Sequence, residues 1–139
     1  MGAAFGPSLN NGGVTNDVVL VDDNSLGDGT GTTTDACEPL TNGGAVSGNI
    51  ALVDRGLCTF VTKVKNAQDA GAVGVIVANH LGDDILAMGG TDNSIDISSV
   101  FVGLSDGAAI KAALGSATIG ANPNDPIDRD GDLDSDIIW

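Results

Sequence analysis

Short runs of aliphatic and β-branched residues recur along the chain, each bounded by glycine, asparagine, aspartate or serine. Runs of this length with such boundaries are typical of buried strands. The pattern predicts strands at residues 18–21, 50–53, 73–78, 100–102 and 117–119. Two further short strands could form at residues 85–88 and 95–97.

Two other segments place apolar residues at helical spacing, and each is followed by a glycine stop. Thr59 can cap the first helix, which is expected to run to about Ala70. Ser105 can cap the second, which is expected to run through Leu114. The expected inner faces are Phe60, Val64 and Ala67 in the first helix and Ala109, Ile110, Ala113 and Leu114 in the second.

The order of strand, helix and strand over residues 50–78 predicts a parallel pair joined by a crossover. The 139 residues fit one domain, and with 21 glycines, no tyrosine and only 3% aromatic residues its core must be aliphatic. We therefore expect a β-rich α/β domain over residues 17–120. Residues 1–16 are a glycine-rich lead-in, and residues 121–139 form an acidic tail.

The net charge is −14, from 19 acidic and 5 basic residues. Nucleic acid and anionic membrane surfaces are therefore not expected as partners, since both attract lysine and arginine. Such a charge favours solubility. We find neither an apolar run long enough to span a membrane nor the pattern of a signal peptide.

The two cysteines, Cys37 and Cys58, admit three interpretations. A structural zinc site needs four ligands, and the chain has one histidine besides the cysteines. The Cys-x-x-Cys spacing of redox pairs is absent. A structural disulfide is favoured, which would indicate an oxidising compartment. Two free, buried cysteines remain the alternative.

His80 is the single histidine, and it follows the expected strand at 73–78. A catalytic triad would need a serine nucleophile beside it, and no nucleophile motif is present. No phosphate-binding glycine loop occurs either. We expect His80 to be exposed and non-catalytic, and to form a candidate binding loop with Asp83 and Asp84.

Residues 51–60, ALVDRGLCTF, and residues 63–79, KVKNAQDAGAVGVIVAN, closely resemble the protease-associated (PA) domain family, as does the stretch ACEPL at 36–40. The resemblance covers most of residues 15–120. It implies a twisted, barrel-like mixed sheet with two flanking helices and a bridge between Cys37 and Cys58. It also implies no catalysis, because PA domains are accessory modules of peptidases, sorting receptors and membrane ubiquitin ligases.

Asp54, Arg55 and Gly56 follow the second strand, where the chain must turn sharply. Gly56 can supply a positive φ angle. Arg55 could pair with Asp54 or donate to backbone carbonyl groups, which would brace the turn. The alternative is that Arg55 anchors a ligand, and we favour the brace.

The tail places aspartate at every second position from residue 128. Calcium prefers clustered carboxylates, so one candidate calcium site comprises Asp128, Asp130, Asp132 and Asp134. The EF-hand order is not matched, and a solvated acidic tail is the favoured interpretation. The stretch RDGDLDSDII at 129–138 is also similar to the segment preceding the zinc-binding helix of fungalysin-like metallopeptidases. That similarity implies that the catalytic motif of the parent protein follows Trp139.

Together these features predict a non-catalytic accessory domain of a secreted peptidase, whose partners are a protein or peptide substrate and the parent catalytic domain. Its role would be recognition of protein substrates or control of access to the catalytic domain. A calcium-stabilised spacer between peptidase domains is the alternative.

Overall fold

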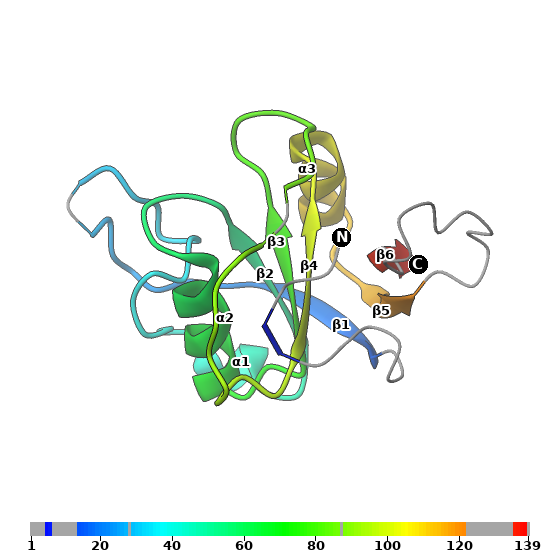
Figure 1. Cartoon of the computed structure of the whole chain (residues 1–139), viewed down its shortest axis with the longest axis horizontal. Coiled ribbons are helices and arrows are strands. Elements are labelled where there is room, and N and C mark those ends of the chain that lie inside the picture. The colour runs from blue at the N-terminus through cyan, green and yellow to red at the C-terminus, as the bar shows by residue number, and fades with distance from the viewer. Residues whose placement is uncertain (1–4, 7–13, 28, 87, 122–134, 139) are drawn as a thin grey trace.

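A computed structural model describes residues 5–6, 14–27, 29–86, 88–121 and 135–138. These residues form six strands and three helices, in the order β1-α1-β2-α2-β3-β4-α3-β5-β6 (Figure 1). The strands are β1 (Val14–Leu20), β2 (Ile50–Asp54), β3 (Gly74–Ala78), β4 (Ser98–Val102), β5 (Ser116–Ala121) and β6 (Ser135–Ile138). The helices are α1 (Gly43–Val46), α2 (Phe60–Asp69) and α3 (Leu104–Ala112).

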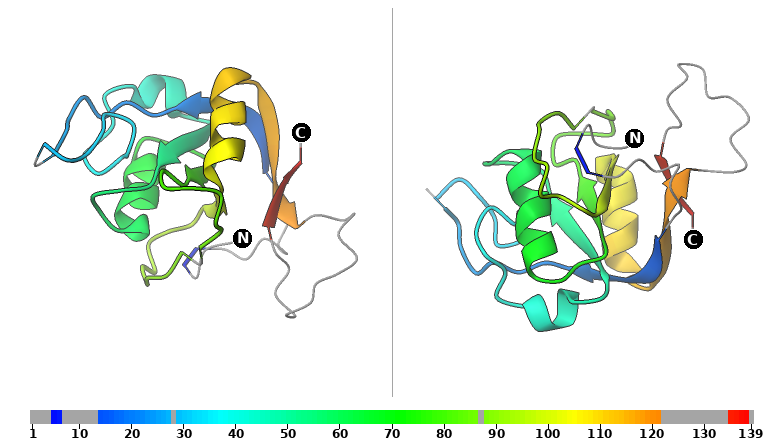
Figure 2. Two further views of the ribbon diagram at one scale, coloured as in Figure 1. Left: turned by 90° about the horizontal axis from the view of Figure 1, so that it is seen from above. Right: turned by 60° about the horizontal axis from the view of Figure 1, so that its bottom comes forward.

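The strands form a single mixed sheet in the order β4-β3-β2-β1-β5-β6. Strands β1 to β4 pair in parallel, whereas β5 pairs antiparallel with both β1 and β6. The first half of β1 pairs with β5, and its second half, from Val18, pairs with β2. Because β1 changes partner midway, the sheet curls around it (Figure 2). The expected twisted, barrel-like mixed sheet is confirmed.

The parallel strands β2, β3 and β4 are buried on both faces, because α2 and α3 lie on opposite sides of them (Figure 2). Alternate residues of each strand therefore enter two separate cores. Beside α2 lie Ala51, Val53, Val75, Val77 and Phe101. Beside α3 lie Ile50, Leu52, Ile76, Val100 and Ile119. This double burial explains why these strands appear in the sequence as continuous apolar runs.

Helix α2 begins and ends close to the predicted residues. The Thr59 side chain accepts a hydrogen bond from the Thr62 amide at 3.2 Å, as expected of its cap. The inner face differs in one respect, since Lys63 is buried there beside Val64 and Ala67. Phe60 packs its ring edge-on against Phe101, with the ring centroids 5.9 Å apart.

The prediction for α3 was wrong at both ends. The cap position is Gly103, and the helix ends at Ala112, before Ala113 and Leu114. Leu114 is therefore 49% exposed, and Gly107 and Ile110 are the helix residues that reach the core. Ala113 and Leu114 were expected on the inner face of this helix, but the helix ends before it reaches them, so they cannot face the sheet as helix residues.

The segments at the two ends of the domain also differ from the expected pattern. Strand β1 begins at Val14, and Phe5 is buried in the α2-side core. Strand β6 pairs with β5 and adds an edge to the sheet that the sequence pattern did not predict. Residues 95–97 do not form a strand and contain only a bend at residue 97, and Met88 makes only an isolated bridge.

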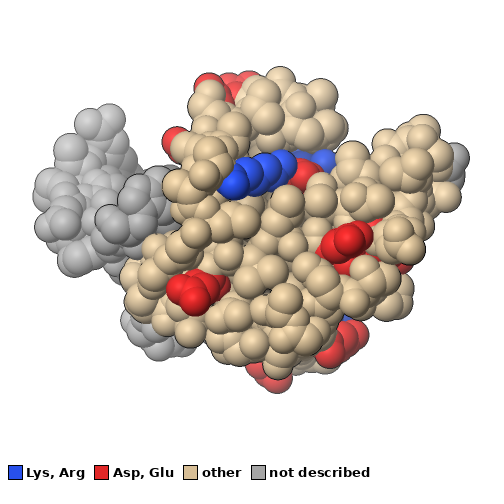
Figure 3. Space-filling view, turned by 180° about the vertical axis from the view of Figure 1, so that it is seen from behind, with Lys and Arg blue, Asp and Glu red and all other residues tan. Residues whose placement is uncertain are grey.

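The acidic residues are dispersed on the face drawn in Figure 3, where they form separate small groups on a broad uncharged surface. No helix in the described parts of the chain has the length and apolar character needed to cross a membrane.

Candidate functional site

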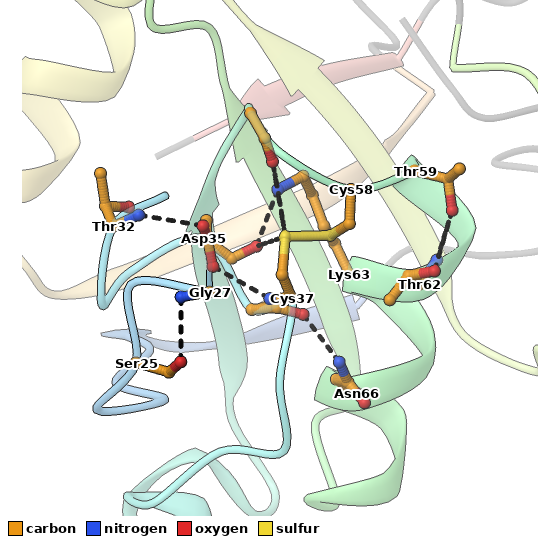
Figure 4. Close-up of a disulfide and its surroundings, with 12 residues drawn as sticks. Ser25, Gly27, Thr32, Asp35, Cys37, Cys58, Thr59, Thr62, Lys63 and Asn66 are labelled. Atoms are coloured by element: carbon orange, nitrogen blue, oxygen red, sulfur yellow. Dashed lines mark hydrogen bonds between the residues drawn. A yellow bond between two sulfur atoms is a disulfide. The ribbon is translucent and has the colours of Figure 1, made fainter. Parts of the chain in front are cut away.

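The disulfide joins the loop before α1 to the turn before α2 (Figure 4). Cys37 and Cys58 are bonded, with their Cα atoms 5.7 Å apart, so the favoured interpretation of the two cysteines is confirmed. Cys37 is further held by its amide, which donates to Asp35 Oδ1 at 3.0 Å. The Asn66 side chain of α2 donates to the neighbouring Ala36 carbonyl at 2.8 Å. The loop is thus attached to α2 by both covalent and polar contacts.

Lys63 lies beneath this disulfide and is fully buried (Figure 4). Its ammonium donates to the carbonyl oxygens of Gly56 at 2.6 Å and Asp35 at 2.8 Å, and it contacts Cys37 Sγ at 3.5 Å. Burial lowers the pKa of Lys63 to about 8, and nearby carboxylates such as Asp35 oppose that shift. At neutral pH the ammonium therefore stays mostly protonated and links two loops to α2.

Three acidic side chains gather near Lys63 in the loops that follow β1. Asp23, Asp35 and Glu38 each place one carboxylate oxygen within 4.8 Å of the others. Asp23 and Asp35 are buried, and Glu38 is half-buried. Burial, followed by the close approach of the Asp35 carboxyl group, raises the pKa of Asp23 to about 6. The sequence pattern did not single out these residues, because they are separated along a loop of ordinary composition.

The turn after β2 has the expected glycine conformation, with φ 129° at Gly56. Its polar contacts differ from the expected ones. Asp54 pairs with Lys111 of α3 at 2.6 Å, while the Arg55 guanidinium donates to Asn79 Oδ1 at 3.0 Å. Arg55 thus connects the ends of β2 and β3, where a local pair with Asp54 or bonds to carbonyl groups had been expected. Asn79 completes the connection by donating to the Asp84 carbonyl at 3.0 Å.

His80, Asp83 and Asp84 lie together at the carboxyl end of β3 and are exposed. A Cβ atom at Gly56 would lie 3.8 Å from His80 Nε2, so His80 is next to the turn after β2. Asp83 accepts hydrogen bonds from both the amide and the hydroxyl group of Ser105 in the first turn of α3. These bonds, the amide first, lower the pKa of Asp83. Asp83 therefore caps α3, and His80 and Asp84 present their side chains to solvent.

An exposed leucine follows each of three neighbouring parallel strands. Leu57 comes three residues after β2, Leu81 three residues after β3 and Leu104 two residues after β4. Leu81 is the most exposed, at 72%. The carboxyl ends of parallel strands lie at one edge of a sheet, so these side chains share that edge with Arg55 and His80. We call this set the carboxyl-edge surface.

The tail aspartates predicted as calcium ligands, Asp128, Asp130, Asp132 and Asp134, lie outside the described residues, so calcium binding there stays a prediction. Sequence reasoning missed Asn79 and Lys63, which bind other loops through buried polar contacts. The sequence feature that could have identified them is a polar residue at a position where the pattern expects an apolar one, at the end of a strand for Asn79 and on the buried face of a helix for Lys63.

The PA domain family profile matches residues 14–110 of the chain. An aminopeptidase from Pseudomonas aeruginosa is 43% identical over 92 residues, which is 66% of this chain and 15% of that protein. A rice protein named for its receptor homology region, transmembrane domain and RING domain is 39% identical over 88 residues, or 61% of this chain and 16% of that protein. The chain thus spans only a small part of these relatives.

Solved structures share the fold at lower identity. A zinc aminopeptidase from Bacillus subtilis superposes with a TM-score of 0.59 at 21% identity, covering 86% of this chain and 30% of that one. A subtilisin-like protease from an Antarctic Pseudoalteromonas superposes with a TM-score of 0.56 at 20% identity, covering 85% of this chain and 28% of that one. Peptidases of two kinds therefore contain this fold as one part of a longer chain. From the family match and the shared fold, we conclude that this chain belongs to the PA domain family.

Proposed function

We propose that the chain is the non-catalytic recognition module of a secreted peptidase and that it binds protein substrates through the carboxyl-edge surface. The observation that carries this proposal is the exposed leucine after each of β2, β3 and β4. Exposed apolar side chains that share one edge are a feature of protein-binding surfaces. Arg55 and His80 supply polar groups beside them, as at the rim of an interface.

The local structure holds this surface in place. The Leu104 amide donates to the Gly82 carbonyl at 2.8 Å, and Asp83 caps the same helix end. Leu57 has a left-handed backbone conformation, with φ 64°, next to the disulfide. A surface whose backbone is fixed in this way loses little conformational entropy on binding.

We propose a zinc metallopeptidase of the fungalysin-like type as the parent protein. The similarity of residues 129–138 to the segment before the zinc-binding helix supports this class, and the aminopeptidase relative supports a peptidase parent. The disulfide supports secretion, because such bonds persist in oxidising compartments. The parent sequence beyond residue 139 tests the class. A His-Glu-x-x-His motif is expected within a few residues, and its absence there would contradict a fungalysin-like parent.

Binding to immobilised denatured collagen, with the pure 139-residue chain, tests the recognition function. The wild-type chain should be retained without cleaving the collagen. The Leu81→Ser/Leu104→Ser double variant should lose at least tenfold in affinity, because it removes two exposed apolar contacts. Leu114→Ser is the matched control, since Leu114 is similarly exposed beyond the opposite end of α3. Equal loss in the control, or no retention of the wild-type chain on either denatured collagen or casein, would contradict the proposal.

A further inference from the structure

The acidic cluster lies near the disulfide, beside the Leu57 end of the carboxyl-edge surface, and its carboxylates have no part in the function proposed above. Asp23 is 5% exposed and Asp35 is 1% exposed, so two carboxylates are almost completely removed from water. Glu38 adds a third, and one oxygen of each lies within 4.8 Å of the others. Burying like charges this close is unfavourable unless something compensates for them.

The hydrogen bonds of the cluster leave part of it without a partner. Asp35 is satisfied, because its two oxygens accept from the amides of Thr32 and Cys37, each at 3.0 Å. Asp23 Oδ1 accepts from the Ser25 amide at 3.1 Å. Asp23 Oδ2 and Glu38 Oε2, by contrast, are buried without any partner. An unsatisfied buried oxygen of this kind indicates a missing donor or cation.

Lys63 is the buried cation nearest to the cluster, and it supplies only part of the compensation. Its three donors point to the carbonyl oxygens of Asp35 and Gly56 and to Cys37 Sγ, and none of the recorded hydrogen bonds reaches a carboxylate of the cluster. Three carboxylates and one ammonium leave a local charge of −2. A divalent cation would balance that charge and would satisfy both unpartnered oxygens.

We propose that Asp23, Asp35 and Glu38 form a calcium-binding site that fastens the loops after β1 to each other. Calcium binds oxygen ligands at about 2.4 Å, so any two ligands of one ion lie no more than about 4.8 Å apart, and the three carboxylates meet that limit. Calcium accepts irregular shells of six to eight oxygens, and water or backbone carbonyls would complete this one. Magnesium fits less well, because it retains its waters and the two aspartates are buried.

The competing explanation is a proton shared between Asp23 and Asp35. It would also relieve the repulsion, and the raised pKa of Asp23 is compatible with it. The two explanations differ in their response to calcium at a pH above that pKa. They differ again in the effect of Asp23→Asn, which preserves the Oδ1 acceptor for Ser25 but replaces the unpartnered oxygen with a donor.

The experiment is a titration of the chelator-treated 139-residue chain with calcium chloride at pH 7.5 and constant ionic strength, followed by calorimetry and by thermal unfolding. We expect one ion to bind with a Kd between about 10⁻⁵ and 10⁻³ M, within the span from sensor sites to extracellular modules, and a melting temperature several degrees higher. Asp23→Asn should fold at least as well as wild type without calcium and should weaken binding at least tenfold. Asp17→Asn, an exposed substitution on β1 with the same change of charge, should leave binding unchanged.

A variant of the tail separates this site from the predicted one at residues 128–134. Changing Asp128, Asp130, Asp132 and Asp134 to asparagine together should leave the tight calcium response intact. Loss of the response in this tail variant, retention of it in Asp23→Asn, or no heat and no thermal shift up to 10 mM calcium would each overturn the proposal. The collagen-binding assay is independent of this result, since its variants lie at the other site.

Discussion

Lys63 is a fully buried cation whose contacts contribute to stability. Its ammonium satisfies two loop carbonyls and lies among acidic groups, so its removal leaves several buried polar atoms without compensation. We predict that Lys63→Met lowers the free energy of unfolding by about 3–5 kcal/mol, the range for removing one partner from a buried charged group. Urea unfolding followed by circular dichroism measures this loss.

Lys65 provides the matched control on the same helix. It pairs with Asp69 at 3.2 Å on the solvent side of α2, where water and salt screen the interaction. Lys65→Met should therefore change the free energy of unfolding by less than about 0.5 kcal/mol. Similar losses in the two variants would contradict the structural role assigned to Lys63.

At the scale of the elements, α3 contacts β3 through a glycine. A Cβ atom at Gly107 would lie 2.6 Å from the Cβ of Ala78, closer than two such atoms can approach. Gly107→Ala gains helix propensity of up to about 1 kcal/mol, but forcing the helix away from the sheet costs about 1–3 kcal/mol. We predict a net loss of stability, measured by urea unfolding. Gly44→Ala in α1 meets no atom within 4 Å and should be neutral or slightly stabilising.

The cap of α3 predicts a dependence on pH. Hydrogen bonds from Ser105 hold the pKa of Asp83 below its usual 3.8, so the ionised cap favours the folded state. This contribution is complete above pH 3.8 and is lost as the pH falls through the lower folded-state pKa. Asp83→Ala should therefore lower the melting temperature at pH 6, and the difference from wild type should shrink below pH 3.8. Asp84→Ala, an exposed neighbour, should show no such trend.

Across the molecule, the sequence pattern predicted an element correctly where the buried residues of that element are contiguous or follow its periodicity. Strands β2, β3 and β4 are buried on both faces, so their apolar runs identified them, and Thr59 marked the start of α2. The disulfide followed from the resemblance of residues 36–79 to the PA domain family. These features depend on residues that are close in sequence or on one family-like motif.

Features that depend on distant contacts could not be predicted. Asp83 replaces Ser105 as the cap of α3, because the loop after β3 folds over the helix end. Lys63 is covered by the loops at residues 35 and 56, whose contacts with the helix the apolar spacing of α2 does not reveal. Strand β6 forms because β5 offers a free edge, which the acidic composition of the tail does not reveal.

The disulfide attaches a long connection to the body of the domain, so its removal should lower the free energy of unfolding. Among the described residues between β1 and β2, the short helix α1 is the only regular element, and Cys37 lies midway along this connection. The two cysteines are 21 residues apart in the sequence. In the chain-entropy model, removing the bond between them should lower the free energy of unfolding by about 3 kcal/mol. We predict a loss of this size in the Cys37→Ser/Cys58→Ser variant by urea unfolding. The hydrogen bonds from Lys63 and Asn66 should keep the loop in place, so the variant should stay folded at 25 °C. A variant that is unfolded in buffer would mean that the polar contacts alone cannot hold the loop.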